Sequence, residues 1–289
     1  MASLPTVTVL EAIQRSTDFL ARKGVDSPRL QAELLLAHVL QKPRLKLYLE
    51  FDRKLTENEI NHLRDLVRRR GLREPLQYII GRAAFCGRDL LVNRHVFIPR
   101  PETEQLAELG WSRLLQCPAP RLALDIGTGS GCIAIALVEH CPETRCIATD
   151  RSAEALEVAR YNVCEAGLTD RIDLVLGDRL TAVPPQPRFD LIISNPPYIP
   201  TAQLASLQPE IRLHEPVLAL DGGPDGLDAF RWLAAEARAR IRPNGTLLLE
   251  CGDEQTETVA DLLTQHNWIV AHIHPDYTHR PRFVEARPK

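Results

Sequence analysis

The segment LALDIGTGSGC, residues 122–132, decides the fold that we predict for this chain of 289 residues. Its apolar half, residues 122–126, is typical of a buried strand, and the glycines at positions 127, 129 and 131 indicate a tight turn. The apolar residues from Cys132 to Val138 then predict a helix. A strand, a glycine turn and a helix in this order are typical of a parallel α/β sheet, where ligands bind beyond the carboxyl ends of the strands.

Strands and helices continue to alternate after this segment. Further strands are predicted over residues 146–150, 172–176, 189–193 and 246–250, near 268–273 and near 282–287. Helices are predicted over residues 153–165, 226–241 and 254–265. The pattern favours a mostly parallel α/β sheet of about seven strands that is covered by helices on both faces.

The first 73 residues predict helices only, which we interpret as a small helical bundle domain. Ser27 and Pro28 indicate a helix start, and residues 56–59 have the pattern of a capping box. We expect Leu30, Leu34, Leu35 and Val39 to form one buried face. The basic residues 68–70 are interpreted as a helix end that complements the helix dipole, rather than as a nucleic-acid site.

Residues 74–99 differ from both flanking regions and predict a β-hairpin linker. Residues 75–81 resemble a strand that ends at a glycine, and residues 85–96 alternate loosely. Pro99 and Pro101 hold Arg100 in an extended conformation, and a helix is expected to begin at Glu102 or Thr103. The expected organisation is therefore a helical domain at 1–73, a linker at 74–99 and an α/β domain at 100–289.

Composition excludes several classes of protein. The net charge of −3 does not indicate general binding to nucleic acid, and no apolar run approaches the roughly 20 residues that cross a membrane. Residues 1–5 lack the features of a secretory signal. The seven cysteines are odd in number and suit a reducing cytoplasm, and no spacing indicates a metal site. We therefore expect a cytoplasmic protein without a metal.

The acidic residues near the strand ends indicate the ligand. The turn Gly127-x-Gly129-x-Gly131 is not the dinucleotide fingerprint, because Cys132 stands where its last glycine would fall, and a dehydrogenase is therefore disfavoured. Asp125 can bind turn amides, and Asp150 stands where an acidic residue accepts from ribose hydroxyls. Asp178 can accept from an adenine amino group. A nucleoside without pyrophosphate fits this set, as in S-adenosylmethionine (SAM) sites.

The sequence Asn195-Pro196-Pro197-Tyr198 follows the strand at 189–193. Alone it is typical of a turn that ends a strand. Beside a methyl donor, the Asn195 Oδ1 and the Pro196 carbonyl can each accept an N–H, and the rings of Pro197 and Tyr198 can hold a planar group between them. This arrangement favours methylation of a nitrogen conjugated to a π-system, by positioning and electrostatic complementarity.

Five segments of the chain resemble the HemK/PrmC family, the protein-(glutamine-N5) methyltransferases of class 1 peptide chain release factors. They are residues 73–81, the IPRPETE segment at 98–104, residues 125–131, residues 194–198 and residues 215–227. The resemblance implies a class I, Rossmann-like SAM-dependent methyltransferase domain and transfer of methyl to the glutamine of a Gly-Gly-Gln loop. It implies SAM as cofactor, S-adenosyl-L-homocysteine as product, and a release factor as partner. We expect a monomer that binds neither nucleic acid nor membrane.

The family's residues carry over to specific positions. Those for SAM are Phe97, Arg100, Gly127, Thr128, Gly129, Ser130, Gly131, Asp150 and Asn195, to which the strand ends add Asp125, Asp178 and Arg179. The glutamine-binding and catalytic loop corresponds to Asn195, Pro196, Pro197 and Tyr198. Two positions depart from the family: Arg179 stands where an aromatic residue often covers adenine, and Cys86 replaces an aromatic residue of the linker.

Two other functions share part of this pattern. An N6-adenine methyltransferase of DNA or RNA carries the same Asn-Pro-Pro-Tyr sequence, but it usually needs a basic groove and a domain that receives a flipped base. A regulator that binds SAM or a nucleotide without catalysis need not keep the Asn195 loop. The acidic net charge and the intact loop disfavour these two alternatives respectively.

Overall fold

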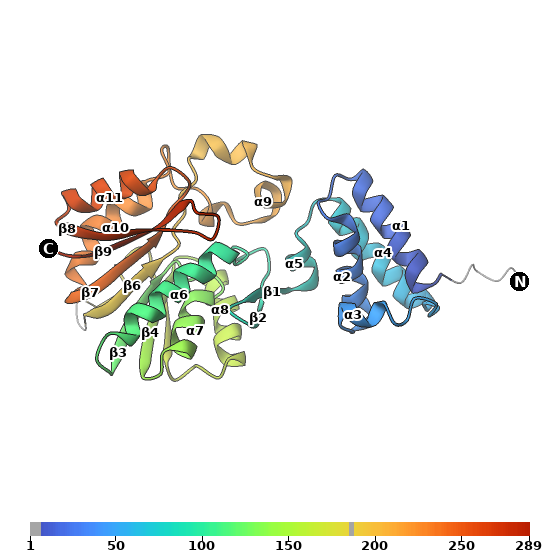
Figure 1. The fold of residues 1–289 in the computed structure, drawn as a ribbon, viewed down its shortest axis with the longest axis horizontal. Coiled ribbons are helices and arrows are strands. Elements are labelled where there is room, and N and C mark those ends of the chain that lie inside the picture. The colour runs from blue at the N-terminus through green and yellow to red at the C-terminus, as the bar shows by residue number, and fades with distance from the viewer. Residues whose placement is uncertain (1–6, 185–187) are drawn as a thin grey trace, which may run out of the picture. The chain divides into compact units, whose positions relative to one another are not determined.

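The computed structural model describes residues 7–184 and 188–289, which form two compact units (Figure 1). The first unit comprises the chain as far as Gly81 together with Gln208–His214. The second comprises Arg82–Leu207 and Glu215–Lys289. The N-terminal residues 1–5, in which we expect no targeting signal, lie outside the described part of the chain.

The described residues of the first unit are helical, apart from short connections. Its helices are α1 (Val9–Arg22), α2 (Pro28–Leu40), α3 (Arg44–Leu47), α4 (Glu57–Gly71), α5 (Leu76–Ile80) and α9 (Pro209–His214). The predicted capping box is confirmed, since the Thr56 hydroxyl accepts from Glu59 N and the Glu59 carboxylate accepts from Thr56 N. Apolar residues of α1, α2, α4 and α5 share one core.

Three expectations for this unit need correction. Helix α2 begins at Pro28 as predicted, but Ser27 makes no side-chain cap, because its backbone is left-handed with φ of 48°. Leu35 is fully buried as expected, whereas Leu30 is 40% exposed and Leu36 is also fully buried, because α2 packs against several other helices of the unit. The strand expected at 75–81 is the helix α5, which ends at Gly81 with φ of 80°. There Ile79 packs into the helical core, and this tertiary contact overrides the strand preference of isoleucine.

The second unit is built on a mixed sheet with the strand order β5-β4-β3-β6-β7-β9-β8. Its strands are β3 (Arg121–Ile126), β4 (Thr144–Asp150), β5 (Ile172–Leu176), β6 (Phe189–Ser194), β7 (Ile241–Glu250), β8 (Trp268–Pro275) and β9 (Pro281–Pro288). Neighbours from β5 to β7 pair in parallel, whereas β9 pairs antiparallel with both β7 and β8. The predicted α/β sheet of about seven strands is confirmed.

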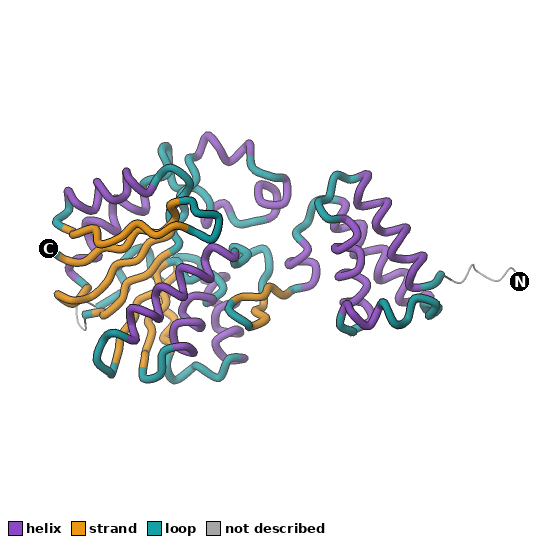
Figure 2. Tube along the Cα trace, in the orientation of Figure 1, coloured by secondary structure: helices purple, strands orange, loops and turns teal. Residues whose placement is uncertain are grey.

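The central strands bury both faces, because successive side chains of a strand point to opposite sides. Ala123 of β3 and Leu191 of β6 face α6 (Pro101–Leu115), α7 (Cys132–His140) and α8 (Ala153–Glu165). Leu124 and Ile192 face α10 (Asp228–Glu236) and α11 (Thr256–Gln265). Figure 2 shows the helices on the two sides of these strands.

A hairpin and several short turns complete the second unit. The hairpin strands are β1 (Arg82–Phe85) and β2 (Arg88–Leu91), joined at Cys86 and Gly87, whose φ values are 47° and 79°. Short 3₁₀ helices lie at Thr201–Ser206, Val217–Ala219 and Ala237–Ala239. The helix expected over 226–241 is shorter, because β7 already begins at Ile241. Among the described residues, the structure contains no helix with the length and apolar character to cross a membrane.

Candidate active site

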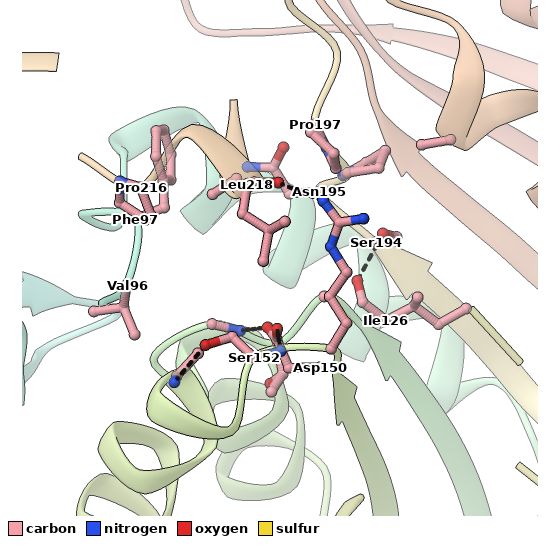
Figure 3. Close-up of a pocket in the computed structure, with 18 of the residues that line it drawn as sticks. Val96, Phe97, Ile126, Asp150, Ser152, Ser194, Asn195, Pro197, Pro216 and Leu218 are labelled. Atoms are coloured by element: carbon pink, nitrogen blue, oxygen red, sulfur yellow. Dashed lines mark hydrogen bonds between the residues drawn. The ribbon is translucent and has the colours of Figure 1, made fainter. Parts of the chain in front are cut away.

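A cavity of about 290 Å³ opens at the carboxyl ends of β3, β4, β5 and β6 (Figure 3). This volume is close to the lower end of the range for small-molecule sites, roughly 300–1,000 Å³. Its wall includes strand ends, the turns that follow them, and residues 94–97 and 99 before α6. The cavity therefore lies where parallel α/β sheets bind their ligands.

The glycine turn after β3 gives backbone atoms access to the cavity. Gly127 and Gly129 have φ of 73° and 54°, a region that other residues rarely adopt. A Cβ atom built at either glycine meets no protein atom within 4 Å, so open space remains beside the turn. Gly131 differs, because its Cβ would lie 3.4 Å from Ala159 Cβ of helix α8. Gly127 and Gly129 thus form a cradle, while Gly131 serves packing.

The carboxylate of Asp150, at the end of β4, holds the glycine turn in place. Its Oδ2 accepts from Gly129 N at 2.9 Å, and its Oδ1 accepts from Ser152 N at 2.9 Å. Figure 3 shows Asp150 and Ser152 on the wall of the cavity. Each carboxylate oxygen can accept a second hydrogen bond, so Asp150 keeps the capacity to bind hydroxyl groups of a ligand.

Asp125, near the end of β3, stabilises the glycine turn that follows this strand. Its carboxyl group is fully buried and accepts from the Thr128 hydroxyl at 2.6 Å. Burial raises the pKa of Asp125 to about 7. Thr128 lines the cavity but Asp125 does not, so the hydrogen bond of Asp125 holds a residue of the cavity wall in place.

The wall formed after β5 carries Asp178, Arg179 and Trp232. Arg179 has a left-handed backbone with φ of 56°, and its guanidinium carbon lies 6.0 Å from the centre of the Trp232 ring. Trp232 of α10 therefore places an aromatic ring on this wall beside Arg179. Sequence reasoning missed Trp232, because it lies 53 positions beyond Arg179 and nothing in its helical segment marks it as a ligand residue.

Arg100 stands behind the cavity wall and does not line it. Its guanidinium carbon lies 4.5 Å from the centre of the Phe97 ring, and it forms an ion pair with the buried carboxylate of Glu215. Glu215 also accepts from the backbone N–H of Ile98 at 3.2 Å. Phe97 and Pro216 line the cavity, so Arg100 and Glu215 fix the two segments that carry these rings.

The loop Asn195–Tyr198 begins where β6 ends, and all four of its residues line the cavity. The Asn195 amide donates through Nδ2 to the Thr103 hydroxyl at 3.0 Å. The Tyr198 carbonyl accepts from Gln255 Nε2 at 3.0 Å. Gly226 packs so closely that a Cβ there would lie 2.3 Å from the Tyr198 carbonyl oxygen. The glycine-rich segment at 222–226 is thus the support of this loop.

Most of the predicted site residues meet in this one cavity. Those that line it are Phe97, Gly127, Thr128, Gly129, Ser130, Asp150, Asp178, Arg179, Asn195, Pro196, Pro197 and Tyr198. Arg100, Asp125 and Gly131 do not line it, and their assignment to the cofactor site stays a prediction. Each contacts a residue or element that forms the wall.

Two further residues, Thr103 and Glu250, were not singled out by the sequence analysis. Thr103 lies in the IPRPETE segment at 98–104, three residues after Arg100, and it lines the cavity. Glu250 ends β7, so the acidic strand-end signal that identified Asp150 and Asp178 was present there too. Among the described residues, no group of three or more His, Cys, Asp or Glu side chains could hold a metal ion.

Comparison with known proteins places the chain in a family. Residues 11–81 match the PrmC N-terminal domain, and residues 111–210 match the methyltransferase small domain. The release factor glutamine methyltransferase of Geobacter sulfurreducens is 43% identical, and the match covers 89% of each chain. The enzyme of the same name from Deinococcus radiodurans is 40% identical over 96% of this chain and 97% of its own.

The chain belongs to the release factor glutamine methyltransferase family. Its fold is that of a class I methyltransferase, and its methyl donor is S-adenosylmethionine. A methyltransferase structure from Pyrococcus furiosus supports the fold, with 19% identity and a TM-score of 0.51 over 71% of this chain and 90% of that one. The open space beside Gly127 and Gly129 and the remaining acceptor capacity of Asp150 fit a nucleoside ligand.

Proposed function

We propose that this protein transfers a methyl group from SAM to the side-chain amide nitrogen (N5) of the glutamine in the Gly-Gly-Gln motif of a class 1 peptide chain release factor. The observation that carries the proposal is that the Asn195 loop, the glycine turn and Asp150 all line one cavity. Membership of the family supports the choice of substrate.

Residues on the strand ends would hold SAM. Gly127 and Gly129 would let the backbone approach the ligand closely, while their N–H groups stay bonded to Thr149 O and Asp150 Oδ2. Asp150 would also accept from ribose hydroxyls. Arg179 and Trp232 would cover the adenine ring, since a guanidinium and an indole both stack on planar groups. Bound SAM supplies an electrophilic methyl group, and S-adenosyl-L-homocysteine remains after transfer.

The Asn195 loop would orient the acceptor nitrogen. An amide nitrogen is a poor nucleophile because its lone pair is delocalised. The Asn195 Oδ1 and the Pro196 carbonyl would accept its two N–H groups, and the rings of Pro197 and Tyr198 would hold the amide plane. These contacts favour a pyramidal nitrogen whose lone pair points at the methyl carbon. No base has to act before attack, because the nitrogen loses its proton after it gains the methyl group.

The helical N-terminal domain, residues 1–73, would bind the body of the release factor, and residues 74–99 would link it to the methyltransferase domain at 100–289. A glutamine side chain alone offers too little binding energy for specificity, so contacts away from the reacting group are required. In this proposal the protein acts as a cytoplasmic monomer and binds neither nucleic acid nor membrane.

The test is an assay with radiolabelled SAM and three acceptors: purified release factor, its variant with alanine in place of the Gly-Gly-Gln glutamine, and DNA. We expect label on the unmodified release factor alone. Label on DNA instead would favour the N6-adenine alternative and contradict the proposal. Equal labelling of the alanine variant would show that another residue is the acceptor.

A further inference from the structure

Three side chains from three different elements form a continuous hydrogen-bond chain beside the cavity. The Asn195 amide at the end of β6 donates to the Thr103 hydroxyl at 3.0 Å. That hydroxyl, in the first turn of α6, donates to Glu250 Oε2 at 2.8 Å. Asn195 and Thr103 line the cavity, whereas Glu250 at the end of β7 is only 2% exposed.

The chemistry of these groups allows only one order of donors and acceptors along the hydrogen bonds that join Asn195, Thr103 and Glu250. An ionised carboxylate only accepts, so the single hydroxyl hydrogen of Thr103 goes to Glu250. The hydroxyl oxygen is then left as an acceptor, and it selects the NH₂ end of the Asn195 amide. The opposite end of the amide, Oδ1, remains free to accept from a partner other than Thr103 and Glu250.

We propose that Thr103 and Glu250 are positioning residues that fix the orientation of the Asn195 amide, so that its Oδ1 faces the N–H of the substrate amide as an acceptor. This inference rests on the proposed function and deepens it. An amide that rotated by half a turn would present an NH₂ group to the substrate N–H, and two donors would then oppose each other.

Protonation of Glu250 would remove the constraint on which groups of this hydrogen-bond series donate and which accept. The groups that face this carboxyl besides Thr103 are the Asn195 side chain, Arg282 of β9, Glu102 of α6, and Tyr198 and Cys251 next to β6 and β7. Burial raises the pKa of Glu250 to about 7, although hydrogen bonds from Thr103 and Asn195 and the charge of Arg282 act to lower it. A protonated Glu250 can donate to Thr103, which frees the Thr103 hydrogen for Asn195 Oδ1 and allows the reversed amide.

The first test compares methyl transfer to the release factor by the wild type, Thr103→Val, Thr103→Ser and Glu250→Gln between pH 6 and 9. We expect kcat of Thr103→Val to fall about 100-fold, as for a misplaced substrate-orienting group, while Thr103→Ser stays within about threefold of the wild type. The wild-type kcat should fall below pH 7, and this acid limb should be absent in Glu250→Gln.

Binding of S-adenosyl-L-homocysteine, measured by calorimetry, separates positioning from structural damage. A distorted cavity would weaken binding, whereas loss of amide orientation should leave the Kd of Thr103→Val within about threefold. Matched controls are Thr264→Val and Glu257→Gln on helix α11, which should behave as the wild type. Wild-type kcat in Thr103→Val, or an unchanged acid limb in Glu250→Gln, would overturn the proposal.

A second test needs no release factor. In protein labelled with ¹⁵N-asparagine, the side-chain amide signal of Asn195 is assigned from its loss in Asn195→Asp. Its shift should titrate with a midpoint near pH 7 in the wild type and not in Glu250→Gln, while the exposed Asn244 stays unchanged. Titration without methylation of the release factor would contradict the proposed function alone. Methylation without titration would contradict the positioning role alone.

Discussion

The carboxylate of Asp150 accepts a hydrogen bond from the backbone N–H of Gly129 at 2.9 Å. The acidic end of β4 therefore holds the glycine turn that follows β3, its neighbour in the sheet. The same carboxylate also accepts from Ser152 N, at the start of α8. One side chain thus joins both turns on this side of the cavity before any ligand binds.

We predict that Asp150→Asn weakens SAM binding about 10–100-fold. The new NH₂ group opposes either a turn N–H or a ribose hydroxyl, and an unmatched buried donor costs about 1–3 kcal/mol. Isothermal titration with S-adenosyl-L-homocysteine measures the change. Asp170→Asn, on an exposed turn, is the control. Equal affinity of Asp150→Asn and the control would refute a role for Asp150 in the nucleoside site.

Gly226→Ala should abolish most methyl transfer without preventing SAM binding. The new Cβ would lie 2.3 Å from the Tyr198 carbonyl oxygen, so the loop that carries Asn195 has to move. Gly167→Ala is a matched control, because its φ of 69° imposes similar backbone strain while no atom lies within 4 Å of the new Cβ. Single-turnover rates at saturating SAM should separate the two variants. Similar rates would show that the loop tolerates displacement.

Glu250→Gln should raise the unfolding free energy above that of the wild type, and this gain should be larger at pH 8 than at pH 5. Burial raises the pKa of Glu250 from 4.5 to about 7, so the folded state binds this proton more tightly than the unfolded state does. The wild-type unfolding free energy therefore falls as pH rises from about 4.5 to 7, and glutamine removes this loss. A gain on the order of 1–3 kcal/mol is expected from urea denaturation.

Part of the wild-type pH dependence should survive in Glu250→Gln. Burial also raises the pKa of Asp125 to about 7, so this second carboxyl contributes a loss of stability over the same pH range. An identical pH slope in the wild type and the variant would show that Glu250 is ionised in the folded protein well below pH 7.

Glu210→Ala should destabilise the helical unit strongly. Glu210 Oε1 accepts from Arg70 at 2.8 Å and Oε2 accepts from Arg73 at 2.7 Å, and the Arg70 side chain is only 5% exposed. Burial disfavours the charge, yet hydrogen bonds from Arg73 and Arg70 hold the pKa of Glu210 below its ordinary value. Removing one partner of a buried pair costs about 3–5 kcal/mol.

Chemical denaturation measures this loss against Glu165→Ala, which removes the partner of Arg82 in an exposed pair. That control should cost less than about 1 kcal/mol. Because the pKa of Glu210 is lowered, its contribution should be complete above pH 4.5 and disappear as the pH falls through its folded value. Equal costs for the two variants would mean that Arg70 finds another partner.

Local sequence determined the parallel core of the fold and most of the cavity wall. A strand that is buried on both faces has to be mostly apolar, and a backbone that approaches a ligand closely needs glycine. The structural roles of residues 122–131 and 189–198 could therefore be predicted from their own residue types. Since parallel strands end at one edge of the sheet, Asp150, Asp178 and Asn195 were expected to meet there, and they line one cavity.

Tertiary structure decided the features that depend on contacts between segments distant in the sequence. Residues 76–80 prefer a strand locally but form a helix, because Ile79 is buried in the helical core. Trp232 reaches the wall beside Arg179, and Arg100 turns away from the cavity toward Glu215, since both depend on elements distant in the chain. The direction of the Asn195 amide likewise follows from Thr103 and Glu250, because a hydrogen bond has a direction only when both partners are in place.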